Sequence, residues 1–305
     1  MSAVLTSTTF KSLGGRIAIQ ADGEGSEEAI AAAEAIVHDL HDSLTRFDPD
    51  SELCQLNADP RDAVPSSPLM IRFAALVHEA GEQTGGLVDA TLLDQIETAG
   101  YVDSIDPDAG FIPASATARP QQARPSTGAW SRVSVDRETS SVLRPCGVRL
   151  DSGGLGKGLA ADLVAEHLNG FASWGVVCAG DLRFGGTSGA PRRIDITSPD
   201  GTGRVIAEFA APSGAVATSG VTRRSWQSDT GRSHHLIDPR TGEPAETGLL
   251  QVTAVAPTAA EAEIRAKAAL LSGPEMASEW LPDGGAIVTE TNELRTFGPV
   301  KETNR

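Results

Sequence analysis

Cysteine is scarce in this chain of 305 residues. There are three, Cys54, Cys146 and Cys178, and no two of them form a CxxC pair. This spacing predicts neither a disulfide framework nor a cysteine-based zinc site. Basic residues are also in deficit, because 25 Lys and Arg stand against 41 Asp and Glu, which gives a formal net charge of −16. That balance argues against non-specific binding to nucleic acid or to an anionic membrane.

Long apolar runs are missing as well. No stretch approaches roughly 18 consecutive apolar residues, so the sequence predicts no membrane span. The opening stretch "MSAVLTSTTFKSLGGRIAIQ" shows no basic n-region, no long apolar h-region and no lipobox, and we therefore expect a cytoplasmic protein. Hydrophobic residues make up 40% of the chain, near the globular average, which argues against widespread disorder.

Short strands and a few helices are expected along the chain. The expected helices are at 26–47, 68–83, 154–169 and 258–272. A strand or hairpin is expected at 8–20, and β-prone runs predict strands at 131–135, 141–150, 175–179, 193–197, 204–209, 249–256 and 285–289. Clustered strands with interspersed helices indicate an α+β fold.

The chain shows no internal repeat and no convincing linker between independent domains. Residues 1–305 are therefore predicted to form a single domain. The segment 103–129 is rich in Pro, Ala and Ser and predicts a long loop or insertion, and 299–305 is expected to be a tail.

The stretch "LDSGGLGKGLAADLVAEHL", residues 150–168, predicts a strand that runs through glycines into a helix. Glycines let a backbone approach a ligand closely, and helix N-terminal amides favour an anion. Lys157 adds positive charge at that end. The pattern is not a Walker P-loop, because Asp151 occupies the position of the first glycine. A ligand site and tight packing of strand against helix both remain open.

Two further glycine-flanked motifs carry polar residues. "VCAGDLRFGG" places Asp181 just after an expected strand end, where a turn aspartate that caps its own backbone is the alternative. "VATSGVTRRSW" offers Thr218 and Ser219 before a glycine, and a turn without function is again the alternative.

The motif "HHLIDPRTGEP", residues 234–244, is denser. A histidine here suits a base or a polar ligand contact, while Asp238 and Thr241 are expected to build a turn. There is no GxSxG elbow for a serine hydrolase and no HExxH for a zinc protease. The number of such motifs suggests several loops that converge on one extended ligand.

Taken in order, these motifs resemble the FAD:protein FMN transferase (ApbE) family, from about residue 13 to 273. "TRFDPDSELCQLN" and "TGGLVDATLLDQI" are similar to two further motifs of that family, and "AGD" corresponds to its GGD motif, with Ala179 in place of the first glycine. The resemblance implies an ApbE-like, T-fold-like α+β fold of mixed and antiparallel sheets with packed helices. It also implies that FAD lies in a cleft between two subregions.

The resemblance also implies a reaction. FAD is split at its pyrophosphate, FMN is joined through its phosphate to a Thr or Ser hydroxyl of a target flavoprotein, and AMP leaves. Two alternatives stay open: an FAD-binding or FAD-sequestering protein, and an FAD pyrophosphatase that releases FMN to water.

The family's functional residues transfer by position onto this sequence. The implied FAD-contacting residues are Leu13, Asn57, Asp89, Thr91, Asp151, Lys157, Thr218 and Ser219. His235 is the candidate general base, with Asp181 second. The family's divalent ion, normally Mg²⁺, would bind the backbone carbonyl of Gly154 and two helix side chains, an aspartate and a threonine four residues later. In this chain those two positions hold Glu263 and Lys267.

The stretch "EAEIRAKAALL" carries two acid–base pairs with i,i+4 spacing. Helical geometry predicts that Glu261 with Arg265 is a surface pair, and that Glu263 with Lys267 faces packed or cleft-lining surroundings. A glutamate keeps a hard oxygen ligand, but an ammonium has no lone pair and repels a cation. Three outcomes follow: the lysine replaces the metal, it swings away from a weakened metal site, or transfer is lost.

Overall fold

The computed structural model describes residues 5–104, 112–113, 124–228 and 231–303. The chain forms two compact units, and neither is one continuous segment. The first unit comprises residues 1–39, 157–222 and 247–305, and the second comprises 40–156 and 223–246. Since four crossings separate these segments, each unit draws its residues from distant parts of the sequence.

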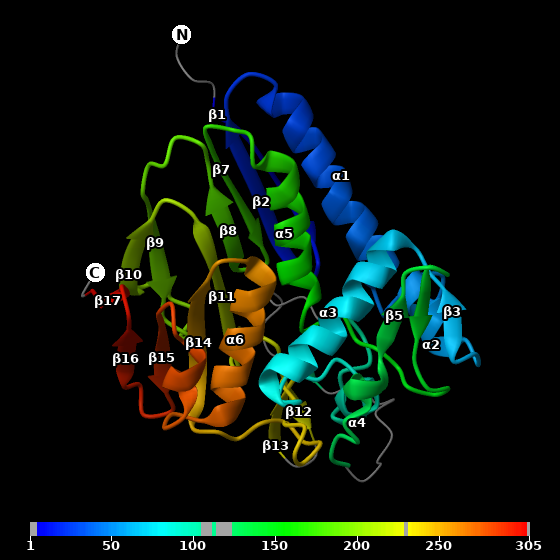
Figure 1. Ribbon diagram of the computed structural model, residues 1–305. Helices are drawn as coiled ribbons and strands as arrows, with labels where there is room; N and C mark the ends of the chain where they lie inside the picture. Colours follow the sequence, from blue (N-terminus) through cyan, green and yellow to red (C-terminus); the bar gives the residue numbers. More distant parts are fainter. Residues whose placement is uncertain (1–4, 105–111, 114–123, 229–230, 304–305) are drawn as a thin grey trace. The chain divides into compact units, whose positions relative to one another are not determined.

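The first unit is built on an eight-stranded sheet in the order β1-β2-β7-β8-β11-β14-β15-β16, in which every neighbouring pair is antiparallel (Figure 1). Its strands are β1 Leu5–Ser12, β2 Gly15–Asp22, β7 Ser173–Cys178, β8 Asp181–Gly185, β11 Gly214–Gly220, β14 Leu249–Ala256, β15 Gly285–Thr289 and β16 Leu294–Phe297. Antiparallel neighbours allow short hairpin connections, and two of these connections carry residues of the candidate site.

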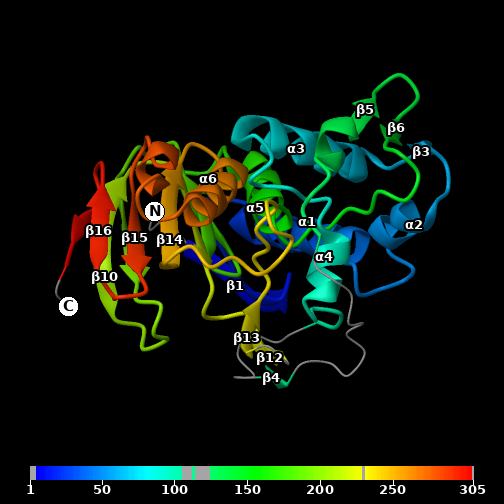
Figure 2. The ribbon, with the colours of Figure 1, turned by 90° about the horizontal axis from the view of Figure 1, so that it is seen from below.

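Helices cover one face of this sheet. α6 (Ala259–Ser272) packs on β8, β11 and β14, and α5 (Gly156–Leu168) lies beside α6 (Figures 1 and 2). The short 3₁₀ helix η2 (Ala277–Trp280) follows and contacts α6. α6 is rich in alanine, which lets its backbone approach the sheet and α5 closely.

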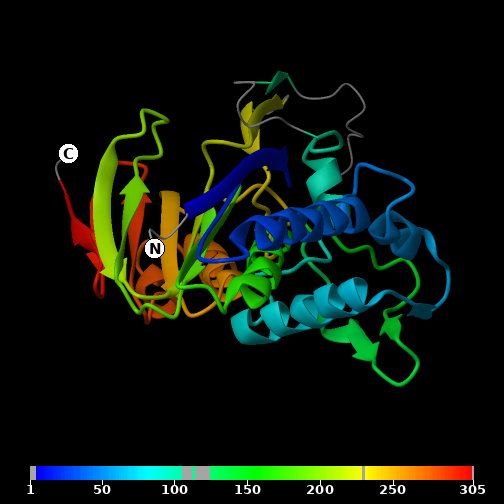
Figure 3. The same cartoon turned by 90° about the horizontal axis from the view of Figure 1, so that it is seen from above.

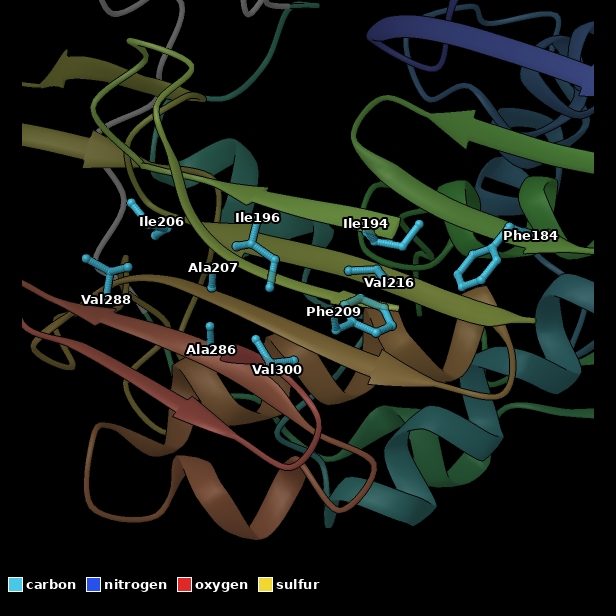
Figure 4. Close-up of a cluster of buried hydrophobic side chains, with 10 residues drawn as sticks. All are labelled: Phe184, Ile194, Ile196, Ile206, Ala207, Phe209, Val216, Ala286, Val288 and Val300. Carbon is cyan, nitrogen blue, oxygen red and sulfur yellow. The ribbon is translucent and has the colours of Figure 1, made fainter. Parts of the chain in front are cut away.

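The other face of the sheet packs on a three-stranded sheet in the order β17-β10-β9, formed by β17 (Lys301–Glu302), β10 (Val205–Ala211) and β9 (Arg192–Thr197). The hydrophobic cluster between the two sheets is shown in Figure 4 and comprises Phe184, Ile194, Ile196, Ile206, Ala207, Phe209, Val216, Ala286, Val288 and Val300. This apolar layer fixes the large sheet between helices on one side and strands on the other.

α1 (Ser26–Leu44) runs alongside the β1–β2 hairpin (Figure 3). Three contacts join the helix to β1: the Thr6 and Ser26 hydroxyls lie 2.6 Å apart, Thr8 donates to Glu34, and the rings of Phe10 and His38 are 4.9 Å apart. The edge strand of the sheet is therefore covered by side-chain contacts along its length.

In its described residues, the second unit combines short and medium-length helices with two small sheets, β3-β6-β5 and β13-β12-β4. Its elements are α2 Glu52–Ala58, β3 Ala63–Pro65, α3 Pro68–Thr84, α4 Leu93–Thr98, β4 Ile112–Pro113, η1 Ala129–Arg132, β5 Ser134–Asp136, β6 Ser141–Leu143, β12 Ser225–Ser228 and β13 Gly231–His234. The β12–β4 pair is parallel, so the protein combines antiparallel and mixed sheets with packed helices, as predicted.

Several expected elements are confirmed closely. The hairpin at 8–20 and the helices at 68–83, 154–169 and 258–272 are present, and β14 and β15 match 249–256 and 285–289. The helix expected over 26–47 ends at Leu44. No helix in the described ranges has both the length and the apolar composition that crossing a bilayer requires.

Other expectations were wrong in detail. The strand expected at 131–135 begins within the 3₁₀ helix η1, and that expected at 141–150 stops at Leu143. The expected tail, 299–305, contains β17, and Val300 is buried in the hydrophobic cluster. Most of the loop expected at 103–129 lies outside the described residues. The short strand β17 was missed because its pairing with β10, rather than the propensity of its own residues, makes it a strand.

Two tight turns lie next to each other at one end of the large sheet. In the β1–β2 turn, Leu13 and Gly14 have φ of 53° and 69°, and in the β7–β8 turn Ala179 and Gly180 have φ of 49° and 104°. Two-residue hairpin loops with positive φ at both positions match the twist of the strands. A Cβ at Gly15 would lie 2.6 Å from the Cβ of Ala179, so this glycine permits an alanine in the neighbouring turn.

We predict that Gly15→Ala lowers the free energy of unfolding by about 1–3 kcal/mol through overpacking against Ala179. Ala179→Gly should largely rescue it, because the substitution removes the clashing methyl group. Gly170→Ala is the control, since its Cβ would meet no atom within 4 Å. Chemical denaturation of the single and double variants measures the coupling, and additive effects would contradict the predicted contact.

Candidate active site

Asp181 is the buried anchor of the candidate site in the first unit. It is the first residue of β8, directly after the Ala179–Gly180 turn, and is 1% exposed. Its Oδ1 accepts the backbone N–H of Thr218 at 3.1 Å, and its Oδ2 contacts Nζ of Lys157. One carboxylate thus connects β8, β11 and the first turn of α5.

Lys157 lies between two acidic side chains. Besides contacting Asp181, its ammonium is 3.3 Å from Oε1 of Glu263 on α6. The Lys157 side chain is 16% exposed, and the carboxylates are almost completely buried. Removing charges from water is costly unless they are paired, so this lysine neutralises acidic groups that the fold could not otherwise bury.

α5 and α6 cap each other's N-termini. Oε2 of Glu263 on α6 accepts the N–H of Gly158 at 2.9 Å, and Asp162 on α5 accepts the N–H groups of Ala259 and Ala260 at 2.8 and 2.9 Å. First-turn N–H groups lack intrahelical partners, so a carboxylate from the neighbouring helix satisfies both ends. The helices approach closely because a Cβ at Gly158 would lie 2.7 Å from the Cα of Ala260.

The two pairs on α6 differ in burial less than predicted, because Glu263 is buried but Arg265 is not the exposed surface residue that was expected. Glu263 and Lys267 are 3% and 13% exposed, with Oε1 and Nζ 3.9 Å apart. Glu261 and Arg265 are 33% and 18% exposed and bond at 2.6 Å. Arg265 also binds Asp283 at 2.5 Å, so it belongs to a three-residue network rather than to an isolated surface pair.

The charges in this cluster have opposite effects on the two carboxylates. Burial raises the pKa of Asp181, and the negative charge of Glu263 adds to the shift, beyond what the single ammonium of Lys157 offsets. Burial alone would also raise the pKa of Glu263, but Lys157 and Lys267, together with the N–H of Gly158, hold it below its usual value. Asp181 is therefore the carboxylate of the two that takes up a proton more readily.

Thr218 and Ser219 do not lie in a turn, and that interpretation of their motif was wrong. Both lie within β11, so their side chains project to opposite faces of the sheet. The Thr218 hydroxyl is 2.9 Å from that of Thr253 on β14, whereas Ser219 is buried. The structure thus connects Thr218 to Asp181 through its backbone and places Ser219 on the other face.

In the second unit, Asp151 pairs with an arginine that sequence analysis missed. Arg46 Nε lies 3.3 Å from Asp151 Oδ1, and both side chains are nearly buried. Asp151 Oδ2 accepts the N–H of Gly153 at 3.1 Å. Asn57 holds the preceding residue, since its amide donates to the Leu150 carbonyl at 2.8 Å and accepts the Leu150 N–H at 2.7 Å.

Arg46 is fixed by aromatic neighbours as well. Its guanidinium lies 4.2 Å from the ring centre of Phe47 and 4.5 Å from that of Tyr101, and it donates to the Tyr101 carbonyl at 2.6 Å. A stacked and bonded guanidinium is held in a single orientation. No sequence pattern indicates this role, because Tyr101 and Asp151 lie far from Arg46 along the chain.

Asp89 and Thr91 form a second polar network. Oδ1 of Asp89 accepts the N–H and the hydroxyl of Thr91 at 2.8 and 2.6 Å, and Oδ2 accepts the hydroxyl of Ser126. The Ser126 N–H donates to the carbonyl of Pro239 at 2.7 Å. Ser126, which sequence analysis assigned only to a loop, therefore joins the "VDAT" motif to the "HHLIDPRTGEP" motif.

The two adjacent histidines have different environments. Nδ1 of buried His234 accepts the N–H of Leu236 at 3.3 Å, so its Nε2 carries the proton and donates to the Ala245 carbonyl at 3.0 Å. His235 is partly exposed, and its Nδ1 lies 3.3 Å from the Arg224 carbonyl. A carbonyl only accepts, so in neutral His235 the proton is on Nδ1 and the lone pair on Nε2.

Asp238 builds the turn that the sequence predicted. Its carbonyl accepts the N–H of Thr241 at 3.2 Å, and its carboxylate binds Arg240 through contacts of 2.8 and 2.7 Å. Partial burial would raise the pKa of Asp238, but hydrogen bonds from Arg240 hold it below its usual value. This aspartate is therefore an ionised structural group.

Two helix positions are expected, from the resemblance, to hold the metal. The residues at these positions in this chain, Glu263 and Lys267, do not fit a divalent cation. Lys267 has no lone pair to offer, and Oε1 of Glu263 has ammonium groups at 3.3 and 3.9 Å. At an effective dielectric of 20, two unit charges 4 Å apart interact by about 4 kcal/mol, and about twice that for a divalent ion. Within the described ranges, no three His, Cys, Asp or Glu side chains converge as a metal cage.

This α+β fold is shared with solved structures of ApbE proteins. The ApbE protein of Thermotoga maritima superposes with a TM-score of 0.82 at 23% identity, covering 96% of each chain. The flavinyl transferase ApbE of Pseudomonas stutzeri gives 0.75 at 22% identity, covering 97% of this chain and 94% of its own. At these identities the similarity shows the fold.

The chain belongs to the ApbE family, whose model matches residues 13–288. The FAD:protein FMN transferase of Vibrio cholerae is 27% identical over 278 residues, which cover 88% of this chain and 78% of that protein. The resemblance drawn from the motifs is therefore confirmed over nearly the whole chain.

We predict that Asp162→Ala lowers the free energy of unfolding by about 1–3 kcal/mol, because two N–H groups at the start of α6 lose their acceptor. Glu166→Ala, an exposed carboxylate on the same helix, should change it by less than about 0.5 kcal/mol. Thermal and denaturant unfolding of both variants measure this, and equal effects would show that the Asp162 cap is not stabilising.

Cys178 should resist alkylation in the native protein. Burial, reinforced by the neighbouring Asp181 carboxylate, raises the pKa of its thiol to about 12, which leaves about one thiolate in ten thousand at pH 8. Iodoacetamide at pH 7 to 9, read by peptide mass spectrometry, should label exposed Cys146 and reach Cys178 only after unfolding. If Cys178 in the native protein were labelled as fast as Cys146, the result would contradict the packing of this strand end.

Proposed function

We propose that this chain is an FAD:protein FMN transferase, acting on FAD and on a Thr or Ser hydroxyl of a target flavoprotein. The observation that carries the proposal is the family match over residues 13–288, together with curated relatives of that name. The geometry agrees with it, because buried Lys157 lies at the start of a glycine-led helix, where anions are favoured.

The reaction makes defined demands on the residues. The acceptor oxygen bonds to the phosphorus of the FMN half, the bridging bond to AMP breaks, and the hydroxyl proton goes to a base. Negative charge shifts onto AMP, so positive groups are needed there. We assign this task to Lys157.

His235 is our candidate for the proton acceptor. Its Nδ1 is directed at the Arg224 carbonyl, which makes Nε2 the basic nitrogen of the neutral ring. Asp181 is second: its raised pKa suits a base, but it is 1% exposed and both its oxygens have partners. We therefore propose that Asp181 positions Lys157.

The remaining predicted residues are proposed to shape the FAD site. The side chain of Asn57 is occupied by the Leu150 backbone, so its proposed role is to hold the segment that carries Asp151. Asp89 and Thr91 would act as one hydrogen-bonded pair. Leu13, in its strained turn, and Thr218 on β11 are proposed to line the ligand, and the contact predicted for Ser219, which is buried on the opposite face of β11, stays a prediction.

Residues 1–305 are proposed to act as one domain, because each of the two compact units is assembled from segments that are far apart in the sequence. A cytoplasmic location remains a prediction, to be tested by cell fractionation. Gly154, the predicted carbonyl ligand of Mg²⁺, belongs to the second unit, and the misfit of Glu263 and Lys267 leaves magnesium out of the proposed reaction.

Incubation with FAD and a flavoprotein acceptor domain should yield AMP and an acceptor that stays fluorescent after denaturation. His235→Ala should slow AMP release about 10²–10⁴-fold, the usual contribution of general base catalysis. His167→Ala, an exposed histidine on α5, should leave it unchanged. Asp181→Asn should slow AMP release less than His235→Ala does. The dependence of the AMP-release rate on pH should keep the same shape in Asp181→Asn as in the wild type.

The same assay separates the alternatives. Free FMN with AMP and no labelled acceptor would mean a pyrophosphatase, and stoichiometric FAD without turnover would mean a binding protein. Either result would overturn the transferase proposal.

A further inference from the structure

Two buried carboxylates and two partly buried ammonium groups form a cluster around the two positions on α6 where the family's metal ligands fall. Asp181 and Glu263 are negative, and Lys157 and Lys267 are positive. Their side chains are 1%, 3%, 16% and 13% exposed, respectively. The formal charges of this cluster cancel, so it is electrostatically complete without an added cation.

Two ammonium groups and one backbone N–H surround the carboxylate of Glu263. Oε2 accepts the N–H of Gly158, and within the described residues the buried Oε1 has no hydrogen-bond partner of good geometry. The ammonium groups of Lys157 and Lys267 lie 3.3 and 3.9 Å from that same oxygen. Two cations thus face the one atom that would otherwise be the metal ligand.

We propose that the ammonium groups of Lys157 and Lys267 together supply the positive charge that a divalent cation would supply, so that FAD binds and is cleaved without Mg²⁺. This inference rests on the proposed function. Lys157 is shared with the resembled family, whereas Lys267 adds one positive charge where that family has a threonine, and ammonium N–H groups suit phosphate oxygens. The bonds that form and break, and the path of the proton, are those of the proposed transfer, and no further reactant is needed.

The two lysines are positioned by different elements. Lys157 is fixed at the start of α5 by Asp181 and Glu263, and Lys267 stands one helical turn after Glu263 on α6. Because the helices cap each other, the spacing of the two ammonium groups is set by the packing of α5 on α6. A threonine at residue 267 would instead offer a hydroxyl oxygen and remove one positive charge.

Metal binding can be measured without turnover. Mn²⁺ is titrated into the protein, with and without FAD, and followed by electron paramagnetic resonance. The wild-type protein should bind no stoichiometric Mn²⁺ beyond the amount that free FAD binds in the same assay. Lys267→Thr should gain one Mn²⁺ per chain, with at least tenfold tighter binding. Lys301→Thr removes the same charge from an exposed strand and should match the wild type. One tight Mn²⁺ in the wild type would overturn the inference, even if the variant fails to fold.

AMP release gives the second readout. In EDTA, the AMP-release rate of the wild type should stay within twofold of its rate without EDTA. The AMP-release rate of Lys267→Thr should fall at least tenfold in EDTA and recover when Mg²⁺ is added. Loss of wild-type activity in EDTA would overturn the inference. If no AMP forms under any condition, the proposed function fails, and the Mn²⁺ titration still decides whether the lysines exclude a metal.

Discussion

The reciprocal capping of α5 and α6 is the interaction on which the candidate site depends. Glu263 satisfies the N-terminus of α5, Asp162 satisfies that of α6, and Gly158 lets the two helix ends meet. Unsatisfied helix termini are costly to bury, so these carboxylates fix the relative position of the helices. The same contact delivers Lys157 to the buried carboxylates, and hence folding and site formation share one set of bonds.

The charged cluster trades stability for a defined arrangement. Replacing buried ion pairs by apolar groups is often neutral or stabilising, so such pairs are weak evidence of a stabilising role. Here each charge has a specific partner: Asp181 joins β8 to β11, Glu263 caps a helix, and Lys157 bridges both acids. Leaving any of them unpaired would bury a net charge. The network therefore explains why polar residues occupy a region that the hydrophobic layers could have filled.

Much of the fold could be predicted from sequence. Helical periodicity located α6, and hydrophobic runs located β14 and β15. The turn residues at Asp238 were recognised by their chemistry. Thr218 and Ser219 were misassigned because a central strand with small polar residues resembles a turn locally, and only pairing with β8 and β14 makes it a strand.

The sequence by itself determined the family, the order of the motifs and the burial of the Glu263–Lys267 pair, because these depend on residue identity and on helical period. Only the tertiary structure decided which atoms meet. Arg46 finds Asp151, Ser126 joins two motifs, and Lys157 reaches Glu263 through contacts between residues distant along the chain. Such contacts depend on chain packing in three dimensions, and one-dimensional patterns carry no direct record of it.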